Sequence, residues 1–220
     1  MGFENVGKSW SVESFAKFLR TQDLGWAKGI TIHHTASPNL LQRPSGWKIQ
    51  HLHNLAHFYG KKLGWSSGPH LFVDEDQALG LSGLHQRGVH ARSFNRTHIG
   101  IEVLGNYDSE DPKSGRGLKC WKMTGEIVRC LLDATSNRLK PTDVNFHRDD
   151  PKTSKTCPGT KVSHEWFQSL IPAVNPLPPA PASPDKGDQS DREDGFDVNE
   201  CLEAIEWQLA KIRKGLEKGS

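Results

Sequence analysis

The chain has 220 residues, with 28 lysines and arginines against 26 aspartates and glutamates, and a formal charge of +2. This length allows one domain with a real core plus an appendage, and the small charge argues against nucleic acid as a partner. No stretch approaches the roughly 18 apolar residues of a membrane span, so we expect no stable membrane insertion.

The start of the chain and its cysteines bear on the cellular compartment. The segment MGFENVGKSWSVESF lacks a charged region followed by an apolar run, so we expect synthesis in the cytoplasm without a Sec signal. The four cysteines, at positions 120, 130, 157 and 201, lack the spacing of a disulfide framework, which favours a reduced chain.

Two elements are predicted at the start of the chain. Val12, Phe15 and Leu19 lie at helical spacing after a serine, which predicts a short amphipathic helix over residues 11–20. Residues 29–35 are rich in β-branched side chains and predict a buried strand that ends at two histidines. Strand ends are where α/β proteins usually keep their chemistry.

Residues 47–62 carry apolar side chains on one face and predict a second helix. His53 and His57 are one turn apart, a spacing that can chelate zinc. No glutamate follows His53 as a zincin helix requires, so a surface helix rich in histidine is the better interpretation.

The middle of the chain predicts three further strands and a long helix. A loop rich in glycine and histidine, residues 83–91, separates the first two of these strands. The last predicted strand is brief and ends in a histidine. These strands cover residues 70–74, 99–104 and 144–147, a turn follows the first of them at residues 74–77, and the helix covers residues 121–138.

The character of the chain changes after residue 171. Prolines followed by a polar run make residues 172–195 a linker that cannot bury a core. Residues 196–220 predict a C-terminal amphipathic helix with apolar residues at alternating steps of four and three. This helix either self-associates or docks on the preceding domain; the regular seam favours self-association, and its short length predicts a weak homo-oligomer.

Three side chains from distant segments suggest a metal site. His33 and His147 stand at the ends of predicted strands, and Cys157 lies in the loop that follows His147. Taken singly, each has an ordinary structural explanation. Together, two imidazoles and one thiolate form a reasonable Zn²⁺ ligand set that leaves a fourth position open for water. Such a metal is suited to hydrolysis.

Five ordered segments resemble one known family. The resemblance spans roughly residues 25–170 and is to the N-acetylmuramoyl-L-alanine amidases, a family shared by phage amidases, bacterial cell-wall recycling amidases and animal peptidoglycan recognition proteins. It implies an α/β fold with a mixed central β-sheet flanked by helices, and a zinc amidase catalytic domain over residues 1–171. The segments are IHHTA from Ile32, GPHLFV from Gly68, VHA from Val89, NRTHIGIE from Asn95, and HRD from His147 through CPG at Cys157.

The resemblance also implies roles for single residues. His33, His147 and Cys157 match the family's zinc ligands. Lys155 matches a lysine that stabilises the developing oxyanion in related phage amidases. Glu102 stands where recycling-type amidases place the glutamate that takes a proton from water.

This chain mixes features of two branches of the family. Many phage and animal members have a tyrosine before the strand at His70, where this chain has Pro69, so Glu102 becomes the more important candidate. Recycling enzymes often have aspartate where Cys157 stands. His90 and Asn95 lie on the loop that lines the substrate groove in relatives, so we predict that they bind substrate, although ordinary loop polarity explains them nearly as well.

The leading hypothesis is hydrolysis of the amide bond between N-acetylmuramic acid and L-alanine in peptidoglycan. With no Sec signal expected, the enzyme best fits a phage or prophage endolysin that acts on the cell wall after release. Two alternatives remain. One is a peptidoglycan-binding module without activity, and the other is a cysteine peptidase with Cys157 as nucleophile and His147 as base.

Overall fold

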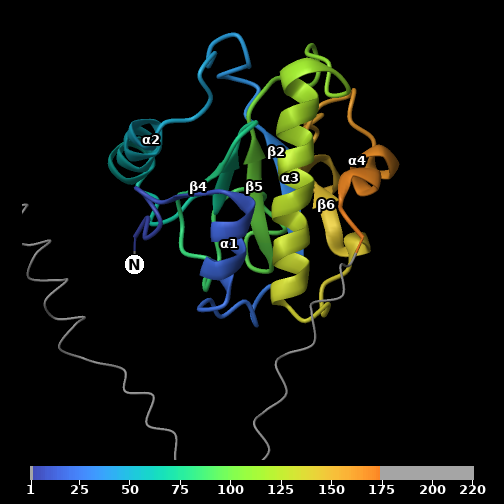
Figure 1. Ribbon diagram of the computed structural model, residues 1–220. Helices are drawn as coiled ribbons and strands as arrows, with labels where there is room; N and C mark the ends of the chain where they lie inside the picture. Colours follow the sequence, from blue (N-terminus) through green and yellow to red (C-terminus); the bar gives the residue numbers. More distant parts are fainter. Residues whose placement is uncertain (1, 174–220) are drawn as a thin grey trace, which may run out of the picture. The chain divides into compact units, whose positions relative to one another are not determined.

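Figure 1 shows the computed structural model, which describes residues 2–173. The C-terminal helix predicted over residues 196–220 and all but the start of the predicted linker lie outside the described residues. In chain order the elements are β1 (Ser9–Trp10), α1 (Val12–Leu19), β2 (Gly29–His34), α2 (Ile49–Lys62), β3 (Leu71–Val73), β4 (Ala78–Gly80), β5 (His98–Val103), α3 (Gly115–Ala134), the 3-10 turn η1 (Pro141–Asp143), β6 (Val144–Phe146), the 3-10 turn η2 (His147–Asp149) and α4 (His164–Leu170).

The strands form one mixed sheet in the order β1-β4-β3-β5-β2-β6. Strands β3, β5, β2 and β6 pair in parallel, whereas β4 is antiparallel to both β3 and β1. The predicted α/β fold with a mixed central sheet is therefore confirmed. Because the parallel strands all point the same way, the residues that follow β2 and β6 meet at one edge of the sheet.

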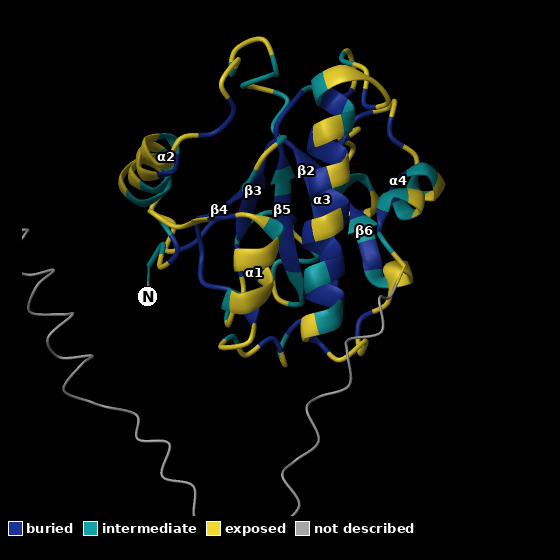
Figure 2. Ribbon diagram, viewed as in Figure 1, coloured by how far each residue is buried: buried dark blue, intermediate teal, exposed yellow. Residues whose placement is uncertain are grey.

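Helices α1, α3 and α4 cover one face of the sheet, and α2 lies apart from them beside β4 (Figure 1). Figure 2 shows most of the central strands and the inner side of α3 as buried. The larger apolar core fills the space between α3 and the sheet, and it includes Ile30 and Ile32 of β2 and Ile99 and Ile101 of β5.

The opposite face of the sheet carries a smaller apolar cluster. Trp47, Leu52 of α2 and Phe72 of β3 are members of this cluster. Side chains alternate along a strand, so His33 of β2 and Glu102 of β5 point away from the α3 core and toward this second face. The two residues are also paired in register across the sheet.

The predicted helix boundaries hold well at α1 and less well at α3. Ser11 caps α1 by accepting a hydrogen bond from the Ser14 amide at 3.3 Å. Helix α3 begins at Gly115 rather than at residue 121, because packing overrides the low helix propensity of its glycine-rich start. It ends at Ala134, since Ser136 and Asn137 take left-handed φ values of 52° and 58°.

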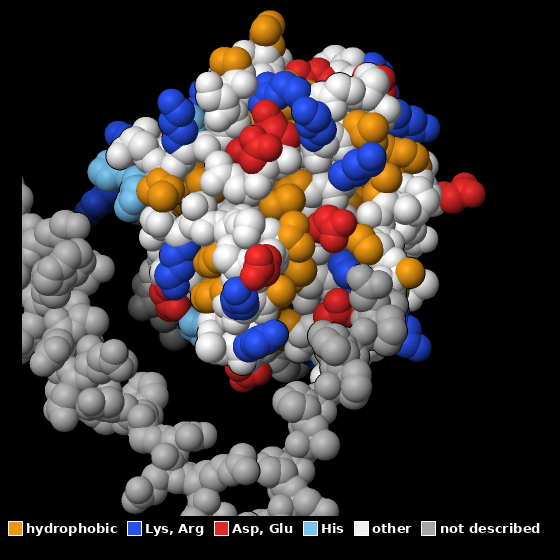
Figure 3. Space-filling model, viewed as in Figure 1, with side chains coloured by type: hydrophobic (Ala, Val, Ile, Leu, Met, Phe, Trp, Pro, Cys, Tyr) orange, Lys and Arg blue, Asp and Glu red, His pale blue; other side chains and the backbone are white. Residues whose placement is uncertain are grey.

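The surface over α1 and α3 is mixed in charge. Acidic and basic side chains are interspersed there with apolar ones, and histidines gather at the side where α2 lies (Figure 3). Within residues 2–173, no helix combines the length and the apolar character needed to cross a membrane.

Candidate metal centre

The sheet brings the three predicted ligands together. Ile32 of β2 pairs with Phe146, the last residue of β6. His33, the next residue of β2, and His147, the first residue of η2, therefore lie side by side at the sheet edge. The loop after η2 returns to this edge and is held there by backbone hydrogen bonds. The Arg148 amide donates to the Cys157 carbonyl at 2.8 Å, and the His34 amide donates to Cys157 Sγ at 3.4 Å.

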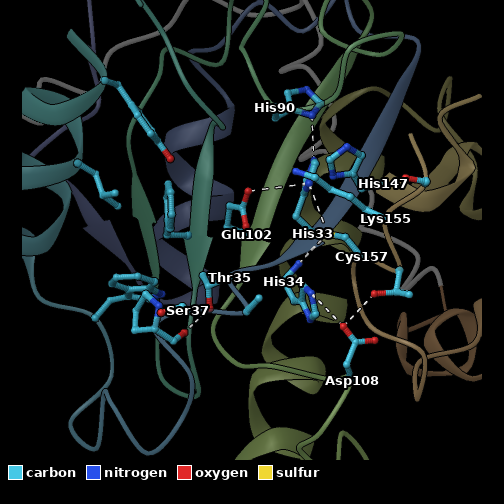
Figure 4. Close-up of a pocket in the computed structure, with 18 residues that line it drawn as sticks. His33, His34, Thr35, Ser37, His90, Glu102, Asp108, His147, Lys155 and Cys157 are labelled. Atoms are coloured by element: carbon cyan, nitrogen blue, oxygen red, sulfur yellow. Dashed lines mark hydrogen bonds and ion pairs between the residues drawn. The ribbon is translucent and has the colours of Figure 1, made fainter. Parts of the chain in front are cut away.

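The donor atoms of His33, His147 and Cys157 all lie within 4.8 Å of one another (Figure 4). Cys157 Sγ is 3.8 Å from His33 Nδ1, and the two imidazole rings have centroids 4.6 Å apart. In the described part of the chain, this is the one group of at least three His, Cys, Asp or Glu residues close enough to share an ion. Zinc takes nitrogen and sulfur ligands of this kind, and the donor set fits it.

Burial shifts the acid–base behaviour of the donors. It holds the pKa of His33 well below its usual range, with His90, His147 and Lys155 adding repulsion against a proton. Burial and then Glu102 raise the pKa of the Cys157 thiol to about 12. Buried groups of this kind disfavour charge in the free protein, and a bound cation is what would stabilise the thiolate.

Glu102 lies on the neighbouring strand beside His33. Its Oε1 is 3.9 Å from His33 Nδ1, and its side chain keeps 17% of its surface accessible. Burial raises the pKa of Glu102 to about 8, and the positive charge of Lys155 opposes that rise. A carboxyl group whose pKa lies near neutrality can both take up and release a proton.

A cavity of about 630 Å³ opens over these residues. Exposed Lys155, from the loop before Cys157, lies on one side of it, next to His147 in Figure 4. Trp47, Phe72 and Tyr59 line the same cavity. From the sequence, Tyr59 had no role beyond the helix predicted over residues 47–62, so the position of its side chain at the border of the site was missed.

His90 and Asn95 border a second, smaller cavity of about 320 Å³ that shares Tyr59 and Glu102 with the first. Both are tied into the protein. Asn95 Oδ1 accepts hydrogen bonds from the backbone amides of His90 at 2.7 Å and Ala91 at 2.8 Å. Nδ1 of His90 lies 3.1 Å from His33 Nε2, and burial lowers the pKa of His90 to about 3. Their contact with substrate stays a prediction.

His53 and His57 of α2 are exposed, and neither belongs to the metal-ligating group. The interpretation of α2 as a helix rich in surface histidine therefore agrees with the structure.

A family model described as N-acetylmuramoyl-L-alanine amidase matches residues 24–160, which is more than half of the 220 residues. The chain belongs to this family. The predicted family is therefore confirmed, and the matched range includes His33, His147, Cys157 and Glu102.

Curated and solved relatives agree with the fold. A peptidoglycan-recognition protein 2 from Holotrichia diomphalia is 25% identical over 124 residues, which cover 53% of this chain and 65% of that protein. The chain thus spans less than two thirds of that relative. The catalytic domain of XlyA superposes with a TM-score of 0.50 at 22% identity, covering 67% of this chain and 87% of that one. Drosophila peptidoglycan recognition protein SD gives 0.51 at 19% identity, covering 64% and 79%.

Proposed function

We propose that the protein is a zinc hydrolase of peptidoglycan that cleaves the amide bond between N-acetylmuramic acid and L-alanine. The observation that carries the proposal is the meeting of His33, His147 and Cys157 within 4.8 Å, beside Glu102 and inside a cavity open to solvent. Membership of the amidase family supports the same substrate bond.

His33, His147 and Cys157 would hold the zinc ion. The ion supplies a Lewis acid that polarises the scissile carbonyl and makes water more acidic. The protein's own contribution is to fix three ligands on two strand ends and one pinned loop, which leaves the cavity side free for substrate.

Glu102 has the position and the pKa for proton transfer. Its Oε1 faces the ligand cluster, and in our proposal it takes a proton from the attacking water and returns it to the departing amine of L-alanine. Lys155 Nζ would offset the negative charge that develops on the carbonyl oxygen. The side chains that do chemistry thus come from β5 and from the loop before Cys157.

The test is digestion of purified murein by the full-length protein. We expect new N-terminal L-alanine, detected by end-group analysis and mass spectrometry, together with one bound zinc per chain by elemental analysis. His33→Ala and Cys157→Ala should lose both the metal and the activity. Murein that stays uncut by a zinc-loaded wild-type protein would refute the proposal.

A binding module without activity is the second candidate, because the curated relative is named as a recognition protein. Zinc-loaded wild-type protein that binds murein without releasing alanine would favour it. The presence of Glu102 and Lys155 beside a full set of three ligands supports the hydrolase instead.

The third candidate, a cysteine peptidase, fits the geometry poorly. A nucleophilic thiol needs a lowered pKa, whereas burial raises the pKa of Cys157 to about 12. Its sulfur accepts a hydrogen bond from the His34 N–H at 3.4 Å and lies 3.8 Å from His33 Nδ1. Activity that survives a chelator and dies on alkylation would be the evidence for this chemistry.

The biological setting we propose is that of a phage or prophage endolysin that reaches the cell wall after release from the cytoplasm. Membership of the amidase family, whose substrate bond lies in the cell wall, supports this placement. Lysis of cells from outside by added protein, and from inside only when a membrane-permeabilising protein is co-expressed, would test this placement.

A further inference from the structure

We infer that His90 is a positioning residue that fixes the tautomer and orientation of the metal ligand His33 through a chain of two hydrogen bonds ending on the backbone carbonyl of His98. This inference rests on the zinc site of the proposed function, but it does not depend on which bond the enzyme cuts.

The two hydrogen bonds lie on the side of the His33 ring opposite the nitrogen that would face the metal. Its Nδ1 faces Cys157 Sγ at 3.8 Å, while its Nε2 lies 3.1 Å from Nδ1 of His90. The other nitrogen of His90, Nε2, lies 3.1 Å from the carbonyl oxygen of His98. The rings of His33 and His90 meet edge to face, at 89° and 5.2 Å between centroids (Figure 4).

The carbonyl at the end of this chain determines where each hydrogen lies. A carbonyl oxygen only accepts, so Nε2 of His90 carries the hydrogen. In a neutral, buried imidazole the other nitrogen is then a bare acceptor, so His33 Nε2 must donate to His90 Nδ1. The lone pair of His33 is thereby left on Nδ1, the atom that faces Cys157 and is needed for a metal.

Two further structural features keep His90 in this position. The first is Asn95, whose Oδ1 accepts from the amides of His90 and Ala91 and so closes the loop. The second is Gly100 of β5, where a Cβ would lie 2.5 Å from Cγ of the His90 ring. A side chain at residue 100 would displace the imidazole, so a glycine there lets His90 lie against the strand.

A ligand histidine whose second nitrogen is hydrogen-bonded binds metal more tightly, and loss of such a partner typically costs about 10–100-fold in metal affinity. His90→Phe removes both hydrogen bonds and keeps a buried ring. We expect its zinc dissociation constant, measured by chelator competition, to rise by roughly 10–100-fold. His90→Asn returns an acceptor near the position of Nδ1 and should recover part of that loss.

The tautomer of His33 can be determined by NMR in the metal-free protein. In long-range ¹H–¹⁵N spectra of the metal-free wild type, His33 and His90 should both be protonated at Nε2. His90→Phe should leave His33 as a mixture of tautomers. In the cobalt-substituted protein, the thiolate-to-metal absorption band should change in His90→Phe, since the geometry around the ion depends on the ring of His33.

Gly100→Ala is an independent variant that keeps every imidazole. Its methyl group should push His90 off His33 and lower zinc affinity in the same direction as His90→Phe. His98→Phe is the matched control: it removes a neighbouring imidazole but keeps the accepting carbonyl, so zinc affinity should not change. Thermal unfolding of the metal-free proteins checks that each variant is folded.

The inference is overturned if His90→Phe and Gly100→Ala both bind zinc as tightly as wild type, or if His33 of the wild type carries its hydrogen on Nδ1. A wild-type protein that binds zinc with His90-dependent affinity and leaves murein intact would support the inference while refuting the proposed hydrolase.

Discussion

At the scale of single residues, the proposed chemistry depends on Glu102 and His33. They lie side by side on paired strands with 3.9 Å between Glu102 Oε1 and His33 Nδ1, which in the proposed mechanism puts a proton carrier next to a metal ligand. Removing the carboxylate should therefore separate metal binding from turnover.

Glu102→Gln should keep its zinc and lose about 10²–10⁴-fold in the rate of murein hydrolysis, the usual contribution of general acid–base catalysis. The amide keeps the size of the side chain but cannot carry the proton. The measurement is kcat on soluble muropeptide together with zinc content. Glu126→Gln, an exposed change of the same kind on α3, is the matched control and should behave as wild type. Undiminished turnover in Glu102→Gln would remove it from the mechanism.

His70 shows a second, structural use of a buried histidine. Its Nδ1 accepts from the Gly100 amide at 2.9 Å, and its Nε2 donates to the Gln86 carbonyl at 2.9 Å. Burial lowers the pKa of His70 from 6.5 to about 4. The folded protein therefore resists a proton that the unfolded chain accepts below about pH 6.5.

His70 should make the metal-free protein less stable as the pH falls from about 6.5 to 4, by up to about 3 kcal/mol, with no further contribution from this group at lower pH. His70→Asn keeps an acceptor for the Gly100 amide and removes the titration. We expect it to be somewhat less stable at pH 7.5 but to lose less free energy of unfolding on acidification, as measured by urea denaturation across this range. His53→Asn controls for the loss of one exposed imidazole. Equal slopes for wild type and His70→Asn would contradict the assignment.

At the scale of elements, the sequence predicted what depends on local pattern. Helices α1 and α2 and strands β2 and β5 were found because periodic apolar side chains mark them. Strand β1 and helix α4 were not predicted, because both are short: β1 is a pair of residues, and α4, although Ser163 caps it, has only 7 residues.

The candidate site likewise has parts that the sequence pattern indicates and parts that depend on contacts between distant segments. The three donor side chains that the structure brings together were singled out because His33, His147 and Cys157 stand in recognisable motifs. The link from His90 to His33 joins a loop to a strand 57 residues away, and no periodicity along the chain encodes such a contact. Tyr59 follows the helical pattern of α2, so its apolar neighbours concealed its position at the cavity.

Helix packing gives a prediction at two glycines. In α3, a Cβ added at Gly125 would overlap the Leu170 carbonyl oxygen at the end of α4, whereas in α2 the nearest atom to a Cβ added at Gly60 would be 3.6 Å away. Gly125→Ala should therefore destabilise the protein by about 1–3 kcal/mol through overpacking. Gly60→Ala should stabilise it by roughly 0.5–1 kcal/mol through helix propensity. Urea unfolding measures both changes in the free energy of unfolding. Stabilisation by Gly125→Ala would contradict the prediction and show that α4 can shift to make room for the methyl group.

At the scale of the whole molecule, the chemistry and the predicted C-terminal helix occupy separate stretches of sequence. The ligands, Glu102 and Lys155 all lie within the family match over residues 24–160, and the predicted heptad seam lies in residues 196–220. Deleting residues 196–220 should therefore leave zinc content and turnover on soluble muropeptide unchanged.

The seam should instead govern self-association. At about three heptads its stability as an isolated coiled coil is marginal, so we expect a concentration-dependent molar mass for the full chain in light scattering and a constant monomer mass for the deletion. Leu209→Glu keeps the chain length while placing a charge in the seam, and it should behave like the deletion; Lys211→Glu lies off the seam and controls for charge. A monomer mass for the full chain at every concentration would contradict self-association, and loss of binding to whole cell walls by Leu209→Glu would then indicate that this segment binds the wall.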